Sequence, residues 1–286
     1  MANVKFLKRL EAAPKVKTQI HALAAPRATA KAVTEFARAI GVDSKRAVVA
    51  QDPVKFTYTA GQHVVALFKA SGAVRYHDDT RWQMDDGKAD LEIADAKAQK
   101  LALAVIKKHK LAPMDEFKLL KVSRLMVGEA NTKTKKGSER AIDVGVAFQR
   151  TVGGVPVDGP GGKLIVYLDH KGELTGFDRI WRPIKGIQAS VKELRDPQLA
   201  EEDLVTYWKA HDTGRIDVDD VRFGYFELGY QDVQRVLQPA YIMPITLVGP
   251  DERIKMKTVH VFAAATNAVG TLMPPPKKVV RQPRRQ

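Results

Sequence analysis

The residues most often used for chemistry are scattered along this chain. The histidines show no HExxH or other paired spacing that would set two imidazoles on one face of a helix; they are His21, His63, His77, His109, His170, His211 and His260. Cysteine is absent, which removes disulfides, thiolate nucleophiles and cysteine-ligated zinc. No G-x-S-x-G nucleophile elbow occurs either. The sequence therefore predicts no catalytic residue, no metal ligand and no cofactor, and we expect a protein that is not an enzyme.

The densest acidic cluster lies between His77 and Lys88. Its oxygen ligands are of the kind that hold a hard cation, but the spacing matches no calcium loop and no bidentate glutamate closes it. Aspartate is also a common turn and capping residue. We interpret the cluster as a solvent-exposed turn that follows the end of a strand. The competing hypothesis is an unrecognised enzyme site built on Asp78, Asp79, Asp85 and Asp86.

The glycine run GPGGK at Gly159–Lys163 fails as a phosphate loop. If Lys163 were the lysine of a Walker motif, Val157 would stand where the motif requires its first glycine, and Leu164 where it requires Ser or Thr. If Gly159 were the first glycine of a dinucleotide-binding G-x-G-x-x-G motif, Leu164 would stand where the third glycine is required. The run also precedes a strand pattern, so no helix N-terminus is present to hold phosphate. We interpret these and the neighbouring residues as structural turns of a hairpin sheet: Gly154, Pro156, Gly159, Gly162 and Gly172.

The chain is strongly basic, with a formal charge of +14. Such a balance favours acidic partners, which include nucleic acid, anionic lipid and acidic proteins. The cations crowd both ends of the chain and the polar segment Gly128–Arg140, which we expect to be a mobile hairpin tip. Aromatic residues interleaved with basic ones are typical of nucleic-acid binding. The candidate binding residues are Lys133, Lys135, Lys136, Arg140, Arg179, Trp181 and Arg182.

These residues must be positioned by a sheet and a few helices. Ile142, Val144, Val146 and Phe148 alternate with small or polar residues, which predicts a half-buried strand. Apolar residues at helical spacing predict helices over 27–40 and 90–110, and a third that begins at Asp196-Pro197. Strand patterns follow each helix, at 54–69 and 73–82, at 117–127 and in three runs within 142–183, and at 221–230, 234–248 and 254–264. This order predicts an α+β fold of antiparallel sheets, each covered by a helix.

The central stretch also carries a recognisable motif. The residues that form it are Val146, Phe148, Gln149, Gly154, Val155, Pro156, Val157, Gly162, Leu164, Val166, Gly172 and Glu173. The motif resembles the PepSY and FTP modules found in propeptides of thermolysin-like and fungalysin metalloproteases. The helix over 90–110 stands where the module's helix would be, and Gln238–Tyr241 lies in what looks like a second, divergent copy. The resemblance implies repeated units with a noncatalytic, protein-binding character.

We expect five segments along the chain. They are an N-terminal arm (1–26), a helix plus β-hairpin unit (27–89), a central PepSY/FTP-like unit (90–190), a second, divergent α+β unit (191–267) and a basic, proline-bearing tail (268–286). No window approaches the ~18 apolar residues of a membrane span. The chain as given shows no signal peptide, which predicts a cytoplasmic location by default, although the family it resembles is usually exported.

The favoured function is that of a noncatalytic protein- or peptide-binding, regulatory or scaffold protein, whose partner is another protein or a peptide segment. One alternative is a basic nucleic-acid or polyanion-binding protein that uses its cationic tails and loop. Another is a structural subunit of a larger assembly.

Overall fold

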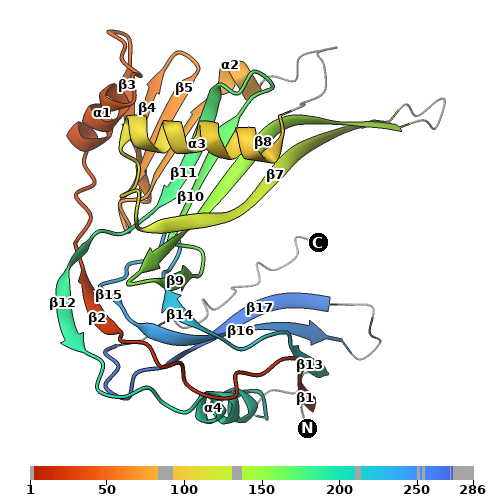
Figure 1. Cartoon of the computed structure of the whole chain (residues 1–286). Helices are drawn as coiled ribbons and strands as arrows, with labels where there is room; N and C mark the ends of the chain where they lie inside the picture. The colour runs from red at the N-terminus through yellow and green to blue at the C-terminus, as the bar shows by residue number, and fades with distance from the viewer. Residues whose placement is uncertain are drawn as a thin grey trace, which may run out of the picture. The chain divides into compact units, whose positions relative to one another are not determined.

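The computed structural model describes residues 3–82, 93–130, 137–209, 214–249, 252, 255–270 and 272 (Figure 1). Strands hold 47% of these residues and helices hold 17%. The chain forms two compact units, each assembled from separate stretches. The first unit comprises Met1–Ile20, Ser190–Phe223 and Gln238–Gln286, and the second comprises His21–Ala189 and Gly224–Leu237. The five consecutive segments expected from the sequence stay a prediction.

The second unit contains a large curved sheet (Figure 1). Its strands run in the order β14-β9-β8-β10-β11-β6-β5-β4-β3, and β7 also pairs with β8. Their bounds are β3 Val48–Gln51, β4 Lys55–Ala60, β5 His63–Phe68, β6 Val74–Asp78, β7 Phe117–Ala130, β8 Gly137–Val152, β9 Val155–Asp158, β10 Lys163–Leu168, β11 Leu174–Ile180 and β14 Arg222–Phe226, the last of which belongs to this unit from Gly224 onward. The β14–β9 pair is parallel, whereas the pairs from β7 and β8 through to β3 are antiparallel.

Two helices cover one face of this sheet. They are α1 (Ala30–Ala39) and α3 (Asp95–His109), and the short helix α2 (Asp79–Trp82) follows β6. The positions of α1 and α3 confirm the helical periodicity read from the sequence. The hydroxyl of Thr29 caps α1 by accepting a bond from the amide of Ala32 at 3.0 Å. The predicted cap at Asp90 lies outside the described residues.

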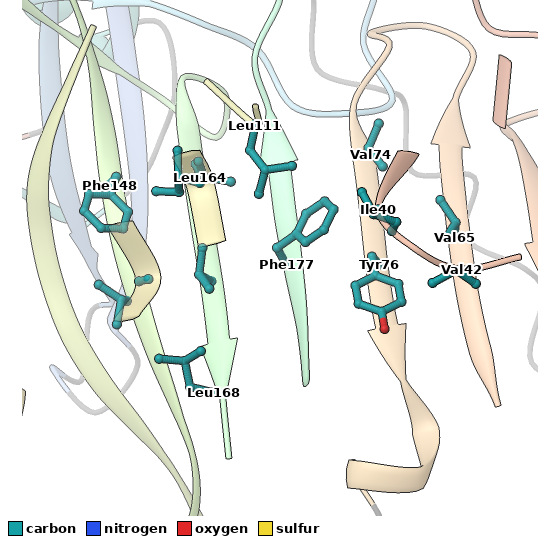
Figure 2. Packing of buried hydrophobic residues seen from close by; sticks show 14 of the residues in the cluster. Ile40, Val42, Val65, Val74, Tyr76, Leu111, Phe148, Leu164, Leu168 and Phe177 are labelled. Carbon is teal, nitrogen blue, oxygen red and sulfur yellow. The ribbon is translucent and has the colours of Figure 1, made fainter. Parts of the chain in front are cut away.

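A single apolar cluster lies between the helices and the sheet (Figure 2). Val144, Val146 and Phe148 of β8 are at most 1% exposed, as their apolar character predicted. The prediction of a half-buried strand is wrong, because Asp143, Ala147 and Gln149 on the other face are also only 3–7% exposed. Phe177 of β11 packs against Tyr76 of β6 with ring centroids 5.6 Å apart. Burial of such side chains is worth roughly 1.5–3 kcal/mol each, so this layer fixes which face of the sheet is internal.

The first unit has a smaller sheet and its own core. Its strands are β1 (Asn3–Phe6), β13 (Arg215–Val218), β16 (Pro239–Val248) and β17 (Lys255–Ala263), in the order β1-β13-β16 with β17 also paired to β16. Helix α4 (Pro197–Lys209) packs on this sheet through Leu204 and Trp208. Asp196 caps α4, because its Oδ1 accepts the amide of Gln198 at 2.9 Å, as the Asp196-Pro197 signal predicted.

A separate three-stranded sheet is formed by β12 (Ile184–Ser190), β2 (Gln19–Leu23) and β15 (Val236–Leu237).

The expected fold class is wrong. The structure is mostly β with mixed pairing, and it is not a series of α+β units with antiparallel sheets. The sequence placed residues 221–230 in a later repeat, yet Tyr225 and Phe226 pair in parallel with Val157 and Asp158. Local periodicity shows which residues form a strand and which face is buried, but it does not select a distant partner strand.

Two strand predictions also need correction. The run expected over 54–69 is a hairpin, because β4 ends at Ala60 and Gly61 turns the chain with φ +62° before β5 begins. The loop expected over 128–140 is shorter in the structure, because β7 continues to Ala130 and β8 begins at Gly137. The tip at 131–136 lies outside the described residues.

The predicted turn residues lie around β9 and β10. Gly154 lies in the turn between β8 and β9, Gly159 and Gly162 lie in the link from β9 to β10, and Gly172 lies in the link from β10 to β11, whereas Pro156 lies within β9 opposite Thr151. Gly162 has a positive φ of +63°, and a Cβ there would lie 2.6 Å from Cγ1 of Val157. Gly154 has a φ of +80° with nothing within 4 Å of such a Cβ.

This difference gives a matched pair of variants. Both Gly162→Ala and Gly154→Ala incur the left-handed backbone cost of roughly 1–2 kcal/mol. Gly162→Ala should lose a further 1–3 kcal/mol or so of unfolding free energy, because the new methyl group collides with Val157. Urea denaturation of both variants measures the difference. Equal losses of unfolding free energy in the two variants would show that the close approach of Val157 does not constrain residue 162 in the link from β9 to β10.

Candidate functional site

Strand β7 forms an edge of the sheet in the second unit. It is 14 residues long, and β8 is its only strand partner in the described chain. Large apolar side chains along it are 39–51% exposed, namely Leu119, Leu120, Leu125 and Met126. A long edge that offers backbone N–H and C=O groups beside exposed apolar side chains is a template for adding another strand.

The same edge is cationic. Lys118 and Lys121 are exposed, and neither forms an ion pair with a residue of the described chain. Arg124, by contrast, is held by Asp95 at 2.7 Å and by the carbonyl of Ile93 at 2.8 Å. Like charges opposite one another destabilise a strand pair, so two copies of β7 are poorly matched to each other. An acidic strand fits this edge better.

Part of β7 extends beyond the other strands as a two-stranded ribbon with β8 (Figure 1). Strand β10 pairs with β8 only between Val144 and Gln149. The pairing of β7 with β8 continues past that point, to Ala130 opposite Gly137. The apolar residues Leu125 and Met126 therefore lie where the sheet narrows to the ribbon.

The opposite edge of this sheet is less suited to strand addition. It is formed by β3, which is only four residues long, although all of them are exposed. Short edge strands are one of the ways in which proteins limit unwanted pairing. The two edges thus differ in length, and β7 is the one that offers an extended surface.

A polar pocket of about 410 Å³ lies over β6, β10 and β11. Its lining residues are Arg75, Tyr76, His77, Asp79, Tyr167 and Asp178. The carboxylate of Asp178 accepts bonds from Arg75 Nε at 2.6 Å and from the Tyr167 hydroxyl at 3.3 Å. Burial and then the field of Asp178 raise the pKa of Tyr167 to about 12, so its hydroxyl stays protonated at neutral pH. Because Asp178 is already paired, this arrangement suits holding a polar group rather than abstracting a proton.

A buried ionic cluster lies elsewhere in the second unit. Glu227 is fully buried, and its Oε1 accepts the amide of Arg182 at 3.0 Å and Nη1 of Arg182 at 3.2 Å. Nη1 of Arg150 lies 3.6 Å from its other oxygen. Burial raises the pKa of Glu227, and the charges of Arg150 and Arg182 oppose that rise. Two guanidinium groups at these distances are the counter-ions of the Glu227 carboxylate.

The two arginines of the cluster connect separate stretches of chain. Arg182 donates to the carbonyls of Leu228, Gly229 and Asp232, each at 2.7 Å. Arg150 donates to the carbonyl of Arg182 at 2.7 Å. The cluster thereby fastens the segment after β14 to the ends of β8 and β11.

Three predicted binding residues meet at this cluster. Trp181 is 4% exposed, and its ring centroid lies 5.0 Å from the guanidinium carbon of Arg150. Arg182 is 2% exposed, and Arg179 is half-buried. Because Trp181 and Arg182 are interior residues of the second unit, the three do not form an open aromatic and basic surface.

The remaining predicted residues are placed only in part. Arg140 lies on β8 opposite Val127, and Lys133, Lys135 and Lys136 lie outside the described residues. Asp78 ends β6 and Asp79 begins α2, whereas Asp85 and Asp86 are also outside. Among the described residues, no group of three or more His, Asp or Glu side chains is arranged to hold a metal ion.

Sequence reasoning missed Arg150 and Glu227. A signal for each is present in the sequence. Arg150 continues the alternation of Val144, Val146 and Phe148, so its position in the strand points to the buried face. Glu227 is the only charged residue in the apolar run FGYFELGY over 223–230. A charge at a core position signals a buried ion pair.

No family model and no curated protein matches this chain. The fold is similar to the crystal structure of an uncharacterized protein from Eubacterium rectale ATCC 33656, with a TM-score of 0.52 and 13% identity, covering 95% of this chain and 90% of that chain. At such identity the likeness concerns the fold alone. The PepSY/FTP resemblance is wrong, since no family model supports it and the mostly β structure lacks the repeated helix-covered units. None of the described helices has the length and apolar character needed to cross a membrane.

The ionic cluster predicts a strong effect of one substitution. Glu227→Gln keeps the shape of the side chain but leaves Arg150 and Arg182 without their buried counter-ion, and it should cost about 3–5 kcal/mol of unfolding free energy. The control is Glu116→Gln, which removes the partly exposed partner of Arg150 at 3.2 Å and should cost about 0–1 kcal/mol. Chemical denaturation measures both values. A Glu227→Gln variant as stable as the control would refute the structural role of the cluster.

A second buried carboxyl, that of Asp143, titrates near neutrality. Asp143 is 4% exposed and its Oδ2 accepts the hydroxyl of Thr175 at 2.9 Å. Burial raises the pKa of Asp143 to about 6, and the nearby Asp169 adds to that rise. The folded protein therefore holds this proton more tightly than the unfolded chain, whose aspartates titrate near pH 3.9. The contribution of the Asp143 carboxyl to the free energy of unfolding is therefore fully present below about pH 4 and is lost as the pH rises through about 6.

Asp143→Asn should remove this pH dependence. The amide still accepts the bond from Thr175 but does not ionise. Relative to the wild-type protein, the variant should gain roughly 2–3 kcal/mol of unfolding free energy between pH 4 and pH 7. Denaturant melts at several pH values measure the gain. A constant difference between the two proteins over that range would contradict the raised pKa of Asp143.

Proposed function

We propose that this protein is a noncatalytic binding protein that takes an extended segment of another protein along the outer edge of β7. The observation that carries the proposal is the 14-residue edge strand with four large apolar side chains 39–51% exposed. Strand addition would satisfy the backbone groups of that edge and cover these side chains at the same time.

The edge also indicates the chemistry of the segment. A bound strand gains about 0.5–1.5 kcal/mol from each net hydrogen bond, whatever its sequence. Selectivity comes from the side chains, and the exposed cations Lys118 and Lys121 favour aspartate or glutamate opposite them. Leu120, Leu125 and Met126 favour apolar residues. The expected partner segment is therefore extended, acidic and apolar.

The other functions considered from the sequence remain predictions. For nucleic-acid binding, the interior positions of Trp181 and Arg182 give no support to an aromatic and basic surface. Of the cationic segments on which that hypothesis also depends, 131–136 and 273–286 lie outside the described residues. At the N-terminal end, Lys8 pairs with Asp220 and Arg9 pairs with Glu201. The hypothesis of a structural subunit in a larger assembly rests on no specific feature of the fold.

The proposal is tested by selecting ten-residue peptides on the immobilised full chain from an unbiased display library. Selected peptides should be rich in Asp, Glu and aliphatic residues. The double variant Lys118→Glu/Lys121→Glu should weaken a selected peptide at least about 10-fold, because it places like charges across the strand pair. Fluorescence anisotropy at fixed ionic strength measures the affinity.

A control with the same change in net charge is Lys97→Glu/Lys100→Glu on the exposed side of α3. It should leave the affinity within about 2-fold, because these charges lie off the β7 edge and are screened by salt. Equal weakening by both pairs would show that only the net charge matters. No weakening by the β7 pair would place the peptide elsewhere.

A further inference from the structure

Arg179 is a cation without a counter-ion in the described chain. It lies on β11, with Val74 of β6 and Leu164 of β10 as its cross-strand neighbours. Both neighbours belong to the apolar core, at 3% and 0% exposed. The Nε of Arg179 is buried and has no hydrogen-bond partner, and its side chain makes no ion pair with any described residue. A guanidinium stays protonated even there, so this buried N–H remains unpaired.

The carboxylates of this region pair with the other two arginines. Glu227 and the 38% exposed Glu116 lie 3.2–3.6 Å from Arg150 or Arg182, and the charge of Asp232 also acts on Arg182. Arg179 has no carboxylate within ion-pair distance among the described residues. Burial and the charge of Arg150 lower the pKa of Arg179, while Glu227 opposes that shift. A buried charge without a partner is costly.

Further unpaired donors surround Arg150. Its own Nε and that of Arg182 are buried without partners, as is Nδ1 of His21. Burial and the field of Arg150 lower the pKa of His21, so its ring is neutral at pH 7. Nε2 of His21 lies 3.4 Å from the Tyr225 hydroxyl, and when Tyr225 donates there the ring proton lies on Nδ1. Glu227 Oε2 is an acceptor without a hydrogen-bond partner, and it already faces Arg150.

We propose that a small oxyanion of the carboxylate or phosphate class binds at Arg179, beside Arg150. The planar fork of a guanidinium matches the paired oxygens of both groups. Arg179 is half-buried rather than enclosed, so an ion from solvent can reach it. The site belongs to the second unit alone and does not depend on the β7 edge.

The test uses the full chain and its Arg179→Gln variant, with inorganic phosphate and acetate as probes and chloride as the reference at equal ionic strength. Phosphate, acetate or both at ~10 mM should raise the melting temperature of the wild-type protein by about 2–4 °C. The variant should lose this rise. In chloride alone it should melt at or above the wild-type temperature, because it removes an unpaired buried charge.

The control variant Arg46→Gln removes an exposed arginine of the same unit and should keep the full response. A response to phosphate alone assigns the site to phosphate groups, and a response to both probes assigns it to oxyanions in general. The proposal is overturned if neither anion stabilises the wild-type protein relative to chloride. It is equally overturned if Arg179→Gln responds as strongly as the control does.

Discussion

The second unit depends on one buried interaction, the carboxylate of Glu227 held between Arg150 and Arg182. Removing three charged groups from water is expensive, and the ion pairs offset that cost only because backbone carbonyls take up the remaining donors of Arg182. Each partner comes from a different stretch of chain, so the cluster forms only when the sheet has its full set of strands. An apolar core alone would tolerate other arrangements of these stretches, and the ionic cluster selects this one.

That constraint explains why the sheet ends as it does. The segment that carries Glu227 follows β14, which pairs with β9 in parallel and so occupies that side of the sheet. Strand β7 pairs with β8 and has no outer neighbour in the described chain. The pairing fixed by the core and the ionic cluster therefore leaves a long cationic and apolar edge exposed. We infer the binding function from this edge.

Part of the fold could be predicted from the sequence. Helices α1 and α3 and the existence of strand β8 followed from periodicity, because each is decided by residues close together in the chain. The burial of both faces of β8 did not follow, because it depends on other parts of the chain. The motif around Gly154 and Pro156 does form the turn and strand that it indicated, but a hairpin is a local structure, and it was mistaken for evidence of a whole PepSY/FTP module. Strand pairing was not predictable, because residues 155–158 and 225–226 have no local signal that joins them. Arg182 was a candidate binding residue for the same reason, since it is paired with Glu227 from far along the chain.

The proposed function depends on where a partner segment binds. Amide hydrogen exchange of the full chain, with and without a saturating selected peptide, reports this directly, because an added strand protects the edge amides that it bonds. We predict new protection along β7, within Phe117–Met126, and no change along the edge strand β3. Protection at β3 or around the Arg75–Asp178 pocket, with β7 exchanging as in the free protein, would contradict the assignment of the β7 edge as the binding site.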